Sequence, residues 1–127
     1  MPTPSELNEM WFTEVWNKRE FDRIPEFMSE DGVAQDFGID SVPVYGPEET
    51  RAQMEASVAR HPDIEFEVVR SIHIENTSMV HWRCTTTGDD GEVHHVDGLS
   101  MCDWKDGKII RGVNGFDPAR FPSRSQN

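Results

Sequence analysis

Residues 79–116 read MVHWRCTTT-GDDG-EVHHVDGLSMCDW-KDG-KIIRGVNGF, and this stretch decides the fold. Two short segments rich in glycine and aspartate, residues 88–91 and 105–107, divide it into three longer runs. Glycine and aspartate readily adopt the backbone conformations that tight hairpin turns need. The stretch therefore predicts three consecutive strands, residues 79–87, 92–104 and 108–116, joined as an antiparallel meander.

A fourth strand is predicted immediately before this meander. Ile64, Phe66, Val68, Ile72 and Ile74 alternate with mostly polar residues. Side chains on a strand point alternately to its two faces, so this period of two is typical of a half-buried strand.

The N-terminal part of the chain has helical spacing instead. Thr3, Pro4 and Glu6 form a capping box with proline at the first helical position, and they predict a helix start. Apolar residues then recur at helical intervals from Leu7 to Trp16.

Two further helices are predicted before residue 62. Apolar residues between Phe21 and Met28 indicate a short second helix that ends at residues 30–32, and Gly46-Pro47 opens a third. Residues 33–36 predict only a short strand between the second and third helices.

Helices followed by a meander of strands are typical of an α+β domain. We expect the helices to pack on a curved, mainly antiparallel sheet, forming one domain over residues 1–127 with a core from about residue 6 to 117. Residues 118–127 are expected to form an irregular tail. The strand over residues 92–104 mixes apolar and polar residues on both faces, which predicts a sheet covered on both sides and a homodimer joined through its outer face.

The charge of the chain excludes some functions. Its 24 acidic and 12 basic residues give a formal net charge of −12. Such a surface repels phosphate backbones and anionic lipid, so we expect neither nucleic acid nor membrane as a partner. No secretory signal is evident at the N-terminus, and a cytoplasmic location is the expectation.

Cysteine and histidine spacing gives no metal motif. Cys84 and Cys102 lack the paired spacing of zinc ligands and are expected to be packing residues. His95 and Asp97 could share one strand face, but two ligands make a weak site. We therefore expect no metal and no cofactor.

Several short motifs occur in an order that resembles a known family. They are Trp16-Asn17 at the end of the first helix, Phe27-Met28-Ser29-Glu30-Asp31, Tyr45-Gly46-Pro47-Glu48-Glu49, His81-Trp82, Gly98-Leu99-Ser100-Met101 and Trp104-Lys105-Asp106-Gly107-Lys108-Ile109. Together they resemble the SnoaL-like polyketide cyclase family of the nuclear transport factor 2-like superfamily, over about residues 6–117. The resemblance implies a cone-shaped fold like that of ketosteroid isomerase, with a pocket between helices and sheet and frequent dimerisation through the sheet.

The resemblance also implies candidate site residues. Asp36 falls where ketosteroid isomerases carry their catalytic base. Phe12 and Ser100 fall where those enzymes carry a tyrosine and an acid that stabilise the enolate, and Ser100 also replaces the aspartate of the cyclase motif. Arg83 falls near the arginine of limonene epoxide hydrolases, whose two acids are replaced here by Thr85 and Asn114.

The two turns predict which residues of the meander share a face. A four-residue turn over residues 88–91 places His81 opposite Gly98, and a three-residue turn over residues 105–107 places Gly98 opposite Asn114. Arg83 and Ser100 would then share that face, and Asp36 would approach it from the helical side.

Two hypotheses of function follow. The first is a cofactor-free enzyme that isomerises or cyclises a small, apolar carbonyl compound by proton transfer, with Asp36 as base and His81 or Asn114 polarising the carbonyl. The second is a non-catalytic ligand-binding or dimerisation module. In both, Phe12, Trp16, Tyr45, Arg83, Ser100 and Asn114 are candidate ligand contacts, with core packing or surface roles as the alternative for each.

Overall fold

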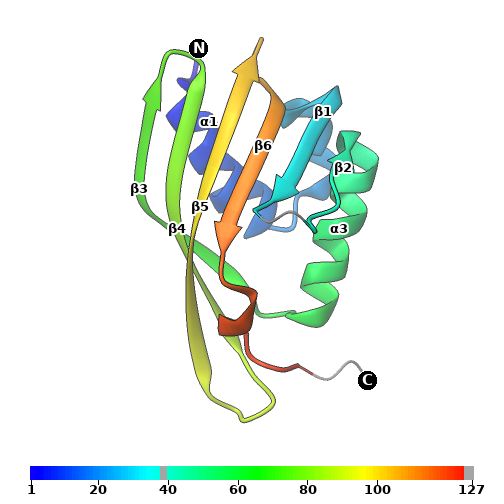
Figure 1. Ribbon diagram of the computed structural model, residues 1–127, viewed down its shortest axis with the longest axis vertical. Helices are drawn as coiled ribbons and strands as arrows, with labels where there is room; N and C mark the ends of the chain where they lie inside the picture. Colours follow the sequence, from blue (N-terminus) through cyan, green and yellow to red (C-terminus); the bar gives the residue numbers. More distant parts are fainter. Residues whose placement is uncertain (38–39, 125–127) are drawn as a thin grey trace.

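A computed structural model describes residues 1–37 and 40–124 of the chain (Figure 1). The helical elements are α1 (Pro4–Met10), a π-helix (Trp11–Trp16) that continues it, a 3₁₀ turn (Phe21–Arg23), α2 (Ile24–Phe27), α3 (Gly46–Arg60) and a second 3₁₀ turn (Pro118–Arg120). The strands are β1 (Met28–Asp36), β2 (Val44–Tyr45), β3 (Glu65–Ile74), β4 (Thr77–Thr87), β5 (Val93–Lys105) and β6 (Lys108–Phe116).

The strands form one six-stranded sheet in the order β2-β1-β6-β5-β4-β3. The pairing is antiparallel except between β1 and β6, which run parallel. Figure 1 shows α1 crossing behind the curved sheet and α3 lying beside β1 and β2. This arrangement confirms the expected α+β class and the mainly antiparallel sheet.

The first helix begins as its sequence predicts. The Thr3 hydroxyl accepts a hydrogen bond from the Glu6 backbone N–H at 3.2 Å, and the Thr3 N–H donates to the Glu6 carboxylate at 3.0 Å. These two bonds satisfy donors that a helix N-terminus leaves free. Among the described residues, no helix is both long and apolar enough to cross a lipid bilayer.

The second helix is shorter than expected and the first strand longer. α2 ends at Phe27, and β1 begins at Met28, whose register partner on β6 is Ile109. Met28 is only 2% exposed, so its burial against the sheet outweighs the local helical pattern. β1 thus runs nine residues, from Met28 to Asp36, and carries Asp36 to its end.

The core lies between the helical layer and the inner face of the sheet. Val15, Ile24 and Val80 are completely buried, and Trp82 and Trp104 are at most 4% exposed. A buried polar chain links the layers, because the Ser78 hydroxyl accepts hydrogen bonds from the Asn8 amide (2.9 Å) and the Trp104 indole N–H (2.8 Å).

The observed strand register differs from the expected one. Glu92 belongs to the turn, where its carbonyl accepts from the Gly88 N–H, so Thr87 pairs with Val93 and His81 pairs with Leu99. The next turn contains two residues rather than three, with Lys105 paired with Lys108.

This shift places a different residue on the inner face. The β5–β6 register shifts between Asp103 and Trp104, just before the second turn, and Ser100, not Gly98, pairs with Asn114. Trp82 pairs with Gly98 and packs inward. The prediction that His81, Gly98 and Asn114 form a row is therefore wrong, and it is wrong on β4 by one residue, which turns every side chain to the other face.

Gly98 is required by the position of Trp82. A Cβ atom at residue 98 would overlap the six-membered ring of the Trp82 indole. We expect Gly98→Ala to displace this ring and to lower the free energy of unfolding by about 1–3 kcal/mol, as overpacked cores do. Urea denaturation followed by tryptophan fluorescence measures the change.

Gly112→Ala is the matched control on the neighbouring strand β6. A Cβ atom there would meet nothing closer than the Cys102 sulfur at 3.5 Å, an ordinary contact. The free energy of unfolding of the Gly112→Ala variant should differ from that of the parent protein by less than about 1 kcal/mol. Equal losses in the two variants would contradict the role assigned to the contact between Trp82 and Gly98.

Candidate functional site

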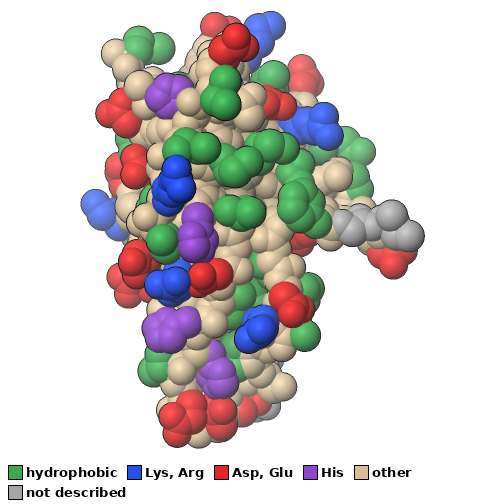
Figure 2. Space-filling model, turned by 60° about the vertical axis from the view of Figure 1, so that its left-hand side comes forward, with side chains coloured by type: hydrophobic (Ala, Val, Ile, Leu, Met, Phe, Trp, Pro, Cys, Tyr) green, Lys and Arg blue, Asp and Glu red, His purple; other side chains and the backbone are tan. Residues whose placement is uncertain are grey.

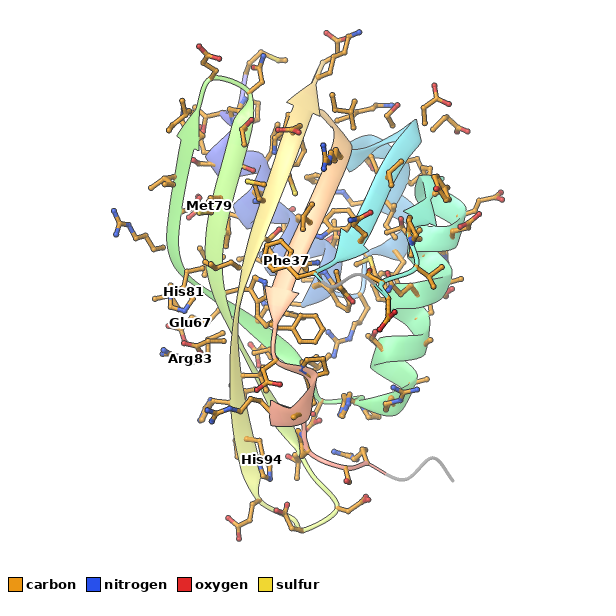
Figure 3. All side chains as sticks on the ribbon, viewed as in Figure 1. Phe37, Glu67, Met79, His81, Arg83 and His94 are labelled. Atoms are coloured by element: carbon orange, nitrogen blue, oxygen red, sulfur yellow. The ribbon has the colours of Figure 1, made fainter. Side chains whose placement is uncertain are left out.

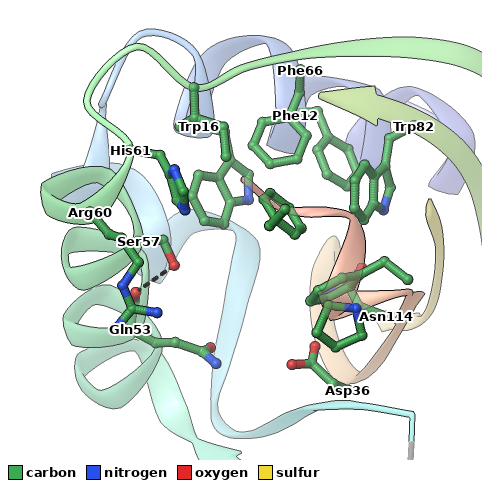
Figure 4. Close-up of a pocket in the computed structure, with 14 residues that line it drawn as sticks. Phe12, Trp16, Asp36, Gln53, Ser57, Arg60, His61, Phe66, Trp82 and Asn114 are labelled. Atoms are coloured by element: carbon green, nitrogen blue, oxygen red, sulfur yellow. Dashed lines mark hydrogen bonds between the residues drawn. The ribbon is translucent and has the colours of Figure 1, made fainter. Parts of the chain in front are cut away.

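A cavity of about 380 Å³ lies between the helices and the inner face of the sheet (Figure 4). This volume is within the range of pockets that hold small organic molecules. One part of its wall is aromatic and another is polar, so the two parts would contact different portions of a bound molecule.

The aromatic wall comes from helices, strands and the C-terminal segment. Its members are Phe12, Trp16, Phe66, Trp82, Phe116 and Phe121. The rings pack against one another, with centroid separations of 5.0 Å for Trp16 and Phe66, 5.4 Å for Phe66 and Trp82, and 5.4 Å for Phe116 and Phe121. Such a wall favours apolar and aromatic ligands.

Asp36 and Asn114 stand side by side at the polar end. They are register partners on the parallel strands β1 and β6, and partners across neighbouring strands lie about 5 Å apart on the same face. Figure 4 shows both side chains at one end of the cavity. The row continues to Ser100 on β5, the partner of Asn114.

The Asp36 carboxyl has no compensating charge among the described residues. Burial raises its pKa, because removal from water disfavours the ionised form. Its backbone N–H is held by the Ser41 hydroxyl at 3.0 Å. The protein thus holds a partly buried, unpaired carboxyl group beside a carboxamide, in an environment suited to proton transfer.

Two buried polar atoms of the lining side chains lack partners. The indole nitrogen of Trp82 and the carbonyl oxygen of Asn114 make no hydrogen bond within the described part of the chain. An unpaired buried polar group costs free energy, so both side chains keep unused hydrogen-bonding capacity beside the cavity.

The remaining polar lining comes from α3 and the residue after it. Gln53, Ser57 and Arg60 recur at helical spacing on one face of α3, and His61 follows the last turn. The His61 ring is 7% exposed and lies 5.6 Å from the Phe121 ring. Burial, more than the nearby Arg60 and Arg124, lowers the His61 pKa, so this imidazole is neutral at pH 7.

Four of the residues singled out from the sequence line the cavity, namely Phe12, Trp16, Asp36 and Asn114. Ser100 points to the same side of the sheet, but it is 4% exposed and lies beneath the lining, with its hydroxyl 3.7 Å from the Cys102 sulfur. Tyr45 is 57% exposed at the start of α3 and does not line the cavity, which corrects its expected position.

His81 and Arg83 lie on the opposite face of the sheet (Figure 3). Both contact Asp97 of β5: His81 Nε2 is 3.0 Å from one carboxylate oxygen, and Arg83 Nε donates to the other at 2.7 Å. The hydrogen bond from Arg83, followed by the one with His81, lowers the Asp97 pKa to about 2. The expectation that His81 and Arg83 reach the cavity is wrong, because the register shift turns Trp82 inward in their place.

Sequence reasoning missed the contributions of α3, His61 and Phe121. The spacing of Gln53, Ser57 and Arg60 places them on one helical face, but nothing in that pattern separates a pocket wall from a solvated surface. Phe121 was assigned to an irregular tail, yet its ring packs on Phe116 and His61. Only the fold brings these residues together.

The cysteines are buried and poorly reactive. Burial raises the pKa of Cys84 to about 12 and that of Cys102 to about 11, which keeps both thiols protonated. Within residues 1–37 and 40–124, no group of three or more His, Cys, Asp or Glu side chains is arranged to hold a metal ion.

Several solved structures share this fold. Wild-type IdmH from Streptomyces antibioticus, named as a candidate polyketide cyclase, aligns with a TM-score of 0.82 and 16% identity over 94% of this chain and 95% of that chain. A candidate SnoaL-like polyketide cyclase from Jannaschia sp. CCS1 aligns at 0.79 and 19% identity, over 90% and 85% of the two chains.

A protein of ketosteroid isomerase-like fold from Catenulispora acidiphila, solved with trimethylamine, aligns at 0.80 and 12% identity over 94% of this chain and 90% of that chain. Curated protein sequences give no significant match. The model of the SnoaL-like domain matches residues 9–112, a range that includes α2, α3 and most of the sheet. This chain belongs to the SnoaL-like domain family.

Proposed function

We propose that this protein is a cofactor-free enzyme that moves a proton within a small, mainly apolar carbonyl compound, as an isomerase or a cyclase. The observation that carries the proposal is the pairing of Asp36 with Asn114 at the polar end of an aromatic cavity. A carboxylate base beside a carbonyl-binding amide is the minimum set for forming an enolate.

The chemistry follows from the two side chains. The Asp36 carboxylate removes a proton from the carbon next to the substrate carbonyl, and the electron pair of that C–H bond moves into the carbonyl to form an enolate. The Asn114 amide N–H donates a hydrogen bond to the oxygen that gains charge. Return of the proton to another carbon completes an isomerisation, whereas attack of the enolate carbon on a second carbonyl closes a ring.

The raised pKa of Asp36 suits this role. A carboxylate that water does not stabilise is a stronger base than an exposed one, and its pKa lies closer to the working pH. A ligand packed against the aromatic wall would displace water from the cavity that would otherwise compete for the proton and weaken the hydrogen bond to the enolate.

The alternative is a binding module that keeps the cavity without the chemistry. Two features favour it: Phe12, at the position expected for a tyrosine donor, has no hydroxyl group, and Ser100 lies beneath the lining. Ligand binding without proton transfer would identify this alternative.

The bicyclic ketone 2-tetralone tests the proton-transfer step. We expect the protein to accelerate exchange of the ketone's α protons for deuterium in D₂O, measured by NMR. Asp36→Asn should reduce this acceleration about 100-fold or more, because the general base is lost. Asp31→Asn, an exposed change on the same strand, should leave the exchange rate unchanged.

This experiment distinguishes the proton-transfer enzyme from the binding module. Acceleration that survives Asp36→Asn would overturn the assignment of the base. Binding of 2-tetralone without any acceleration of exchange would favour the binding module.

The buried carboxyl also predicts a pH-dependent stability difference. In the folded protein Asp36 binds its proton more tightly than in the unfolded chain. The free energy of unfolding therefore falls as pH rises from the pKa of the unfolded chain to the raised pKa of the folded protein. We expect Asp36→Asn to have a higher Tm than the parent protein at pH 7. The difference should vanish below about pH 3, where the carboxyl is neutral in both the folded and the unfolded state, as thermal denaturation across pH can show.

The outer face of the sheet supports a proposal of homodimerisation. Ile72, Met79 and Met101 lie in one cross-strand row, with Leu99 close by, and each of the four is 38–46% exposed. Figure 2 shows apolar side chains gathered on this side of the molecule, above histidine and charged side chains. A patch of this kind is typical of a surface that a partner covers.

We expect a dimer that buries roughly 800 Å² per subunit. Leu99→Asp should shift the mass measured by light scattering to that of a monomer, because it places a charge in the apolar patch. Val93→Asp adds the same charge to the same strand near the hairpin, outside the patch, and should leave the dimer intact. A parent protein that is monomeric at tens of micromolar would rule out this interface.

A further inference from the structure

His61 is a second titratable group at the cavity, across from Asp36 (Figure 4). Its backbone is fixed at the end of α3, where its N–H donates to the Ser57 carbonyl at 2.9 Å and its carbonyl accepts from the Ile64 N–H at 3.0 Å. The backbone that carries the imidazole is therefore held in place by the end of α3 and the residues after it.

The hydrogen bonds around His61 define which ring nitrogen carries the proton. The Thr86 hydroxyl donates its single proton to the Asp63 carboxylate at 2.9 Å, a charge-assisted bond. Toward His61 Nδ1, 3.5 Å away, the same oxygen can only accept. If neutral His61 hydrogen-bonds to the Thr86 oxygen, it carries its proton on Nδ1 and keeps a lone pair on Nε2.

The charged groups around the ring keep this arrangement in place. Asp63 also accepts from the Thr87 N–H at 3.0 Å, and Arg124 Nη1 lies 3.4 Å from an Asp63 oxygen. Hydrogen bonds from Thr87 first, and then from the Thr86 hydroxyl, hold the Asp63 pKa below its usual value, so this carboxylate is ionised. Arg60 and Arg124 oppose a further positive charge on His61, and Nε2 has no hydrogen-bond partner among the described residues.

We propose that His61 is a further ligand-contacting acid–base residue, that Thr86 and Asp63 are its positioning residues, and that the ligand carries a hydroxyl group on an aromatic or unsaturated ring. The ring would pack against the aromatic wall, and its O–H would donate to Nε2. This proposal rests on the proposed function and extends it by naming the substrate class.

The proton balance of the step is simple. Nε2 accepts the hydroxyl proton, the O–H electron pair stays on the ligand oxygen, and the imidazolium so formed later returns the proton to the same ligand at carbon or oxygen. No oxidant or further reactant is needed. Because Asp36 lies across the cavity, one proton can leave near Asp36 while another is exchanged near His61, which suits a conjugated substrate that spans both groups.

The tautomer is tested by ¹⁵N NMR of the histidine rings at neutral pH. In the parent protein, the His61 signals should show a protonated Nδ1 and an unprotonated Nε2. Thr86→Val should shift His61 toward the other tautomer, because the acceptor for Nδ1–H is removed.

Thr85→Val is the matched control. Thr85 is the neighbour of Thr86 on β4, but its hydroxyl lies 3.1 Å from His95 Nδ1 on the outer face. It should change the signals of His95 and leave those of His61 as they are. A His61 proton on Nε2 in the parent protein would overturn the proposal.

The ligand class is tested with 2-naphthol and 2-methoxynaphthalene, which differ in the hydroxyl donor. Isothermal titration calorimetry should show His61→Phe weakening 2-naphthol binding about three- to tenfold, as loss of one hydrogen bond does, and weakening the ether less than twofold. Addition of 2-naphthol should also move the Nε2 signal of the parent protein. Equal effects on both compounds, or no binding of either, would refute the ligand class.

Failure of this inference is distinguishable from failure of the proposed function. The inference alone would be refuted if exchange of the 2-tetralone protons depends on Asp36 but 2-naphthol neither shifts the His61 signals nor binds more weakly to His61→Phe. The expected His61 responses without any proton exchange would leave His61 as a ligand contact and refute the enzyme.

Discussion

The pairing of β4 with β5 controls which side chains face the helices, and the cavity depends on it. Thr87 pairs with Val93 because Glu92 is part of the turn, and this register places Trp82 over Gly98 on the inner face. The indole then contributes both to the core and to the aromatic wall of the cavity. The same register places His81, Arg83 and Asp97 together on the outer face, where Asp97 pairs with Arg83 and contacts the His81 ring.

A second constraint brings the polar end of the cavity together. β1 is the one described strand that runs parallel to its neighbour β6, and it ends where Asp36 meets Asn114. The two residues are far apart in sequence, so the cost of closing the chain between them is recovered through Met28, Ile109 and the helices packed above them. Stability stored in that packing holds a carboxyl group in surroundings that disfavour its charge.

The sequence predicts the fold class and strand order of the meander well, because alternation and turn residues are local signals. Asp36 and Phe12 could be assigned to the cavity through a family resemblance, Trp16 was a candidate ligand contact, and the turn lengths predict the correct face for Asn114. The faces of His81 and Arg83 could not be predicted, since a turn that includes Glu92 shifts the register between β4 and β5 without a clear local signal. Nor could the positions of His61 and Phe121, which depend on contacts between distant segments.

The C-terminal segment forms part of the cavity without belonging to the sheet. Pro118 and Phe121 line the cavity, and Arg124 holds the segment by donating to the Thr87 carbonyl and pairing with Asp63. Substitutions in these residues can reshape the binding space while every strand pairing stays intact. Proteins built this way can diverge in the molecules they accept at little cost to folding, because shape selection and structural integrity are carried by different parts of the chain.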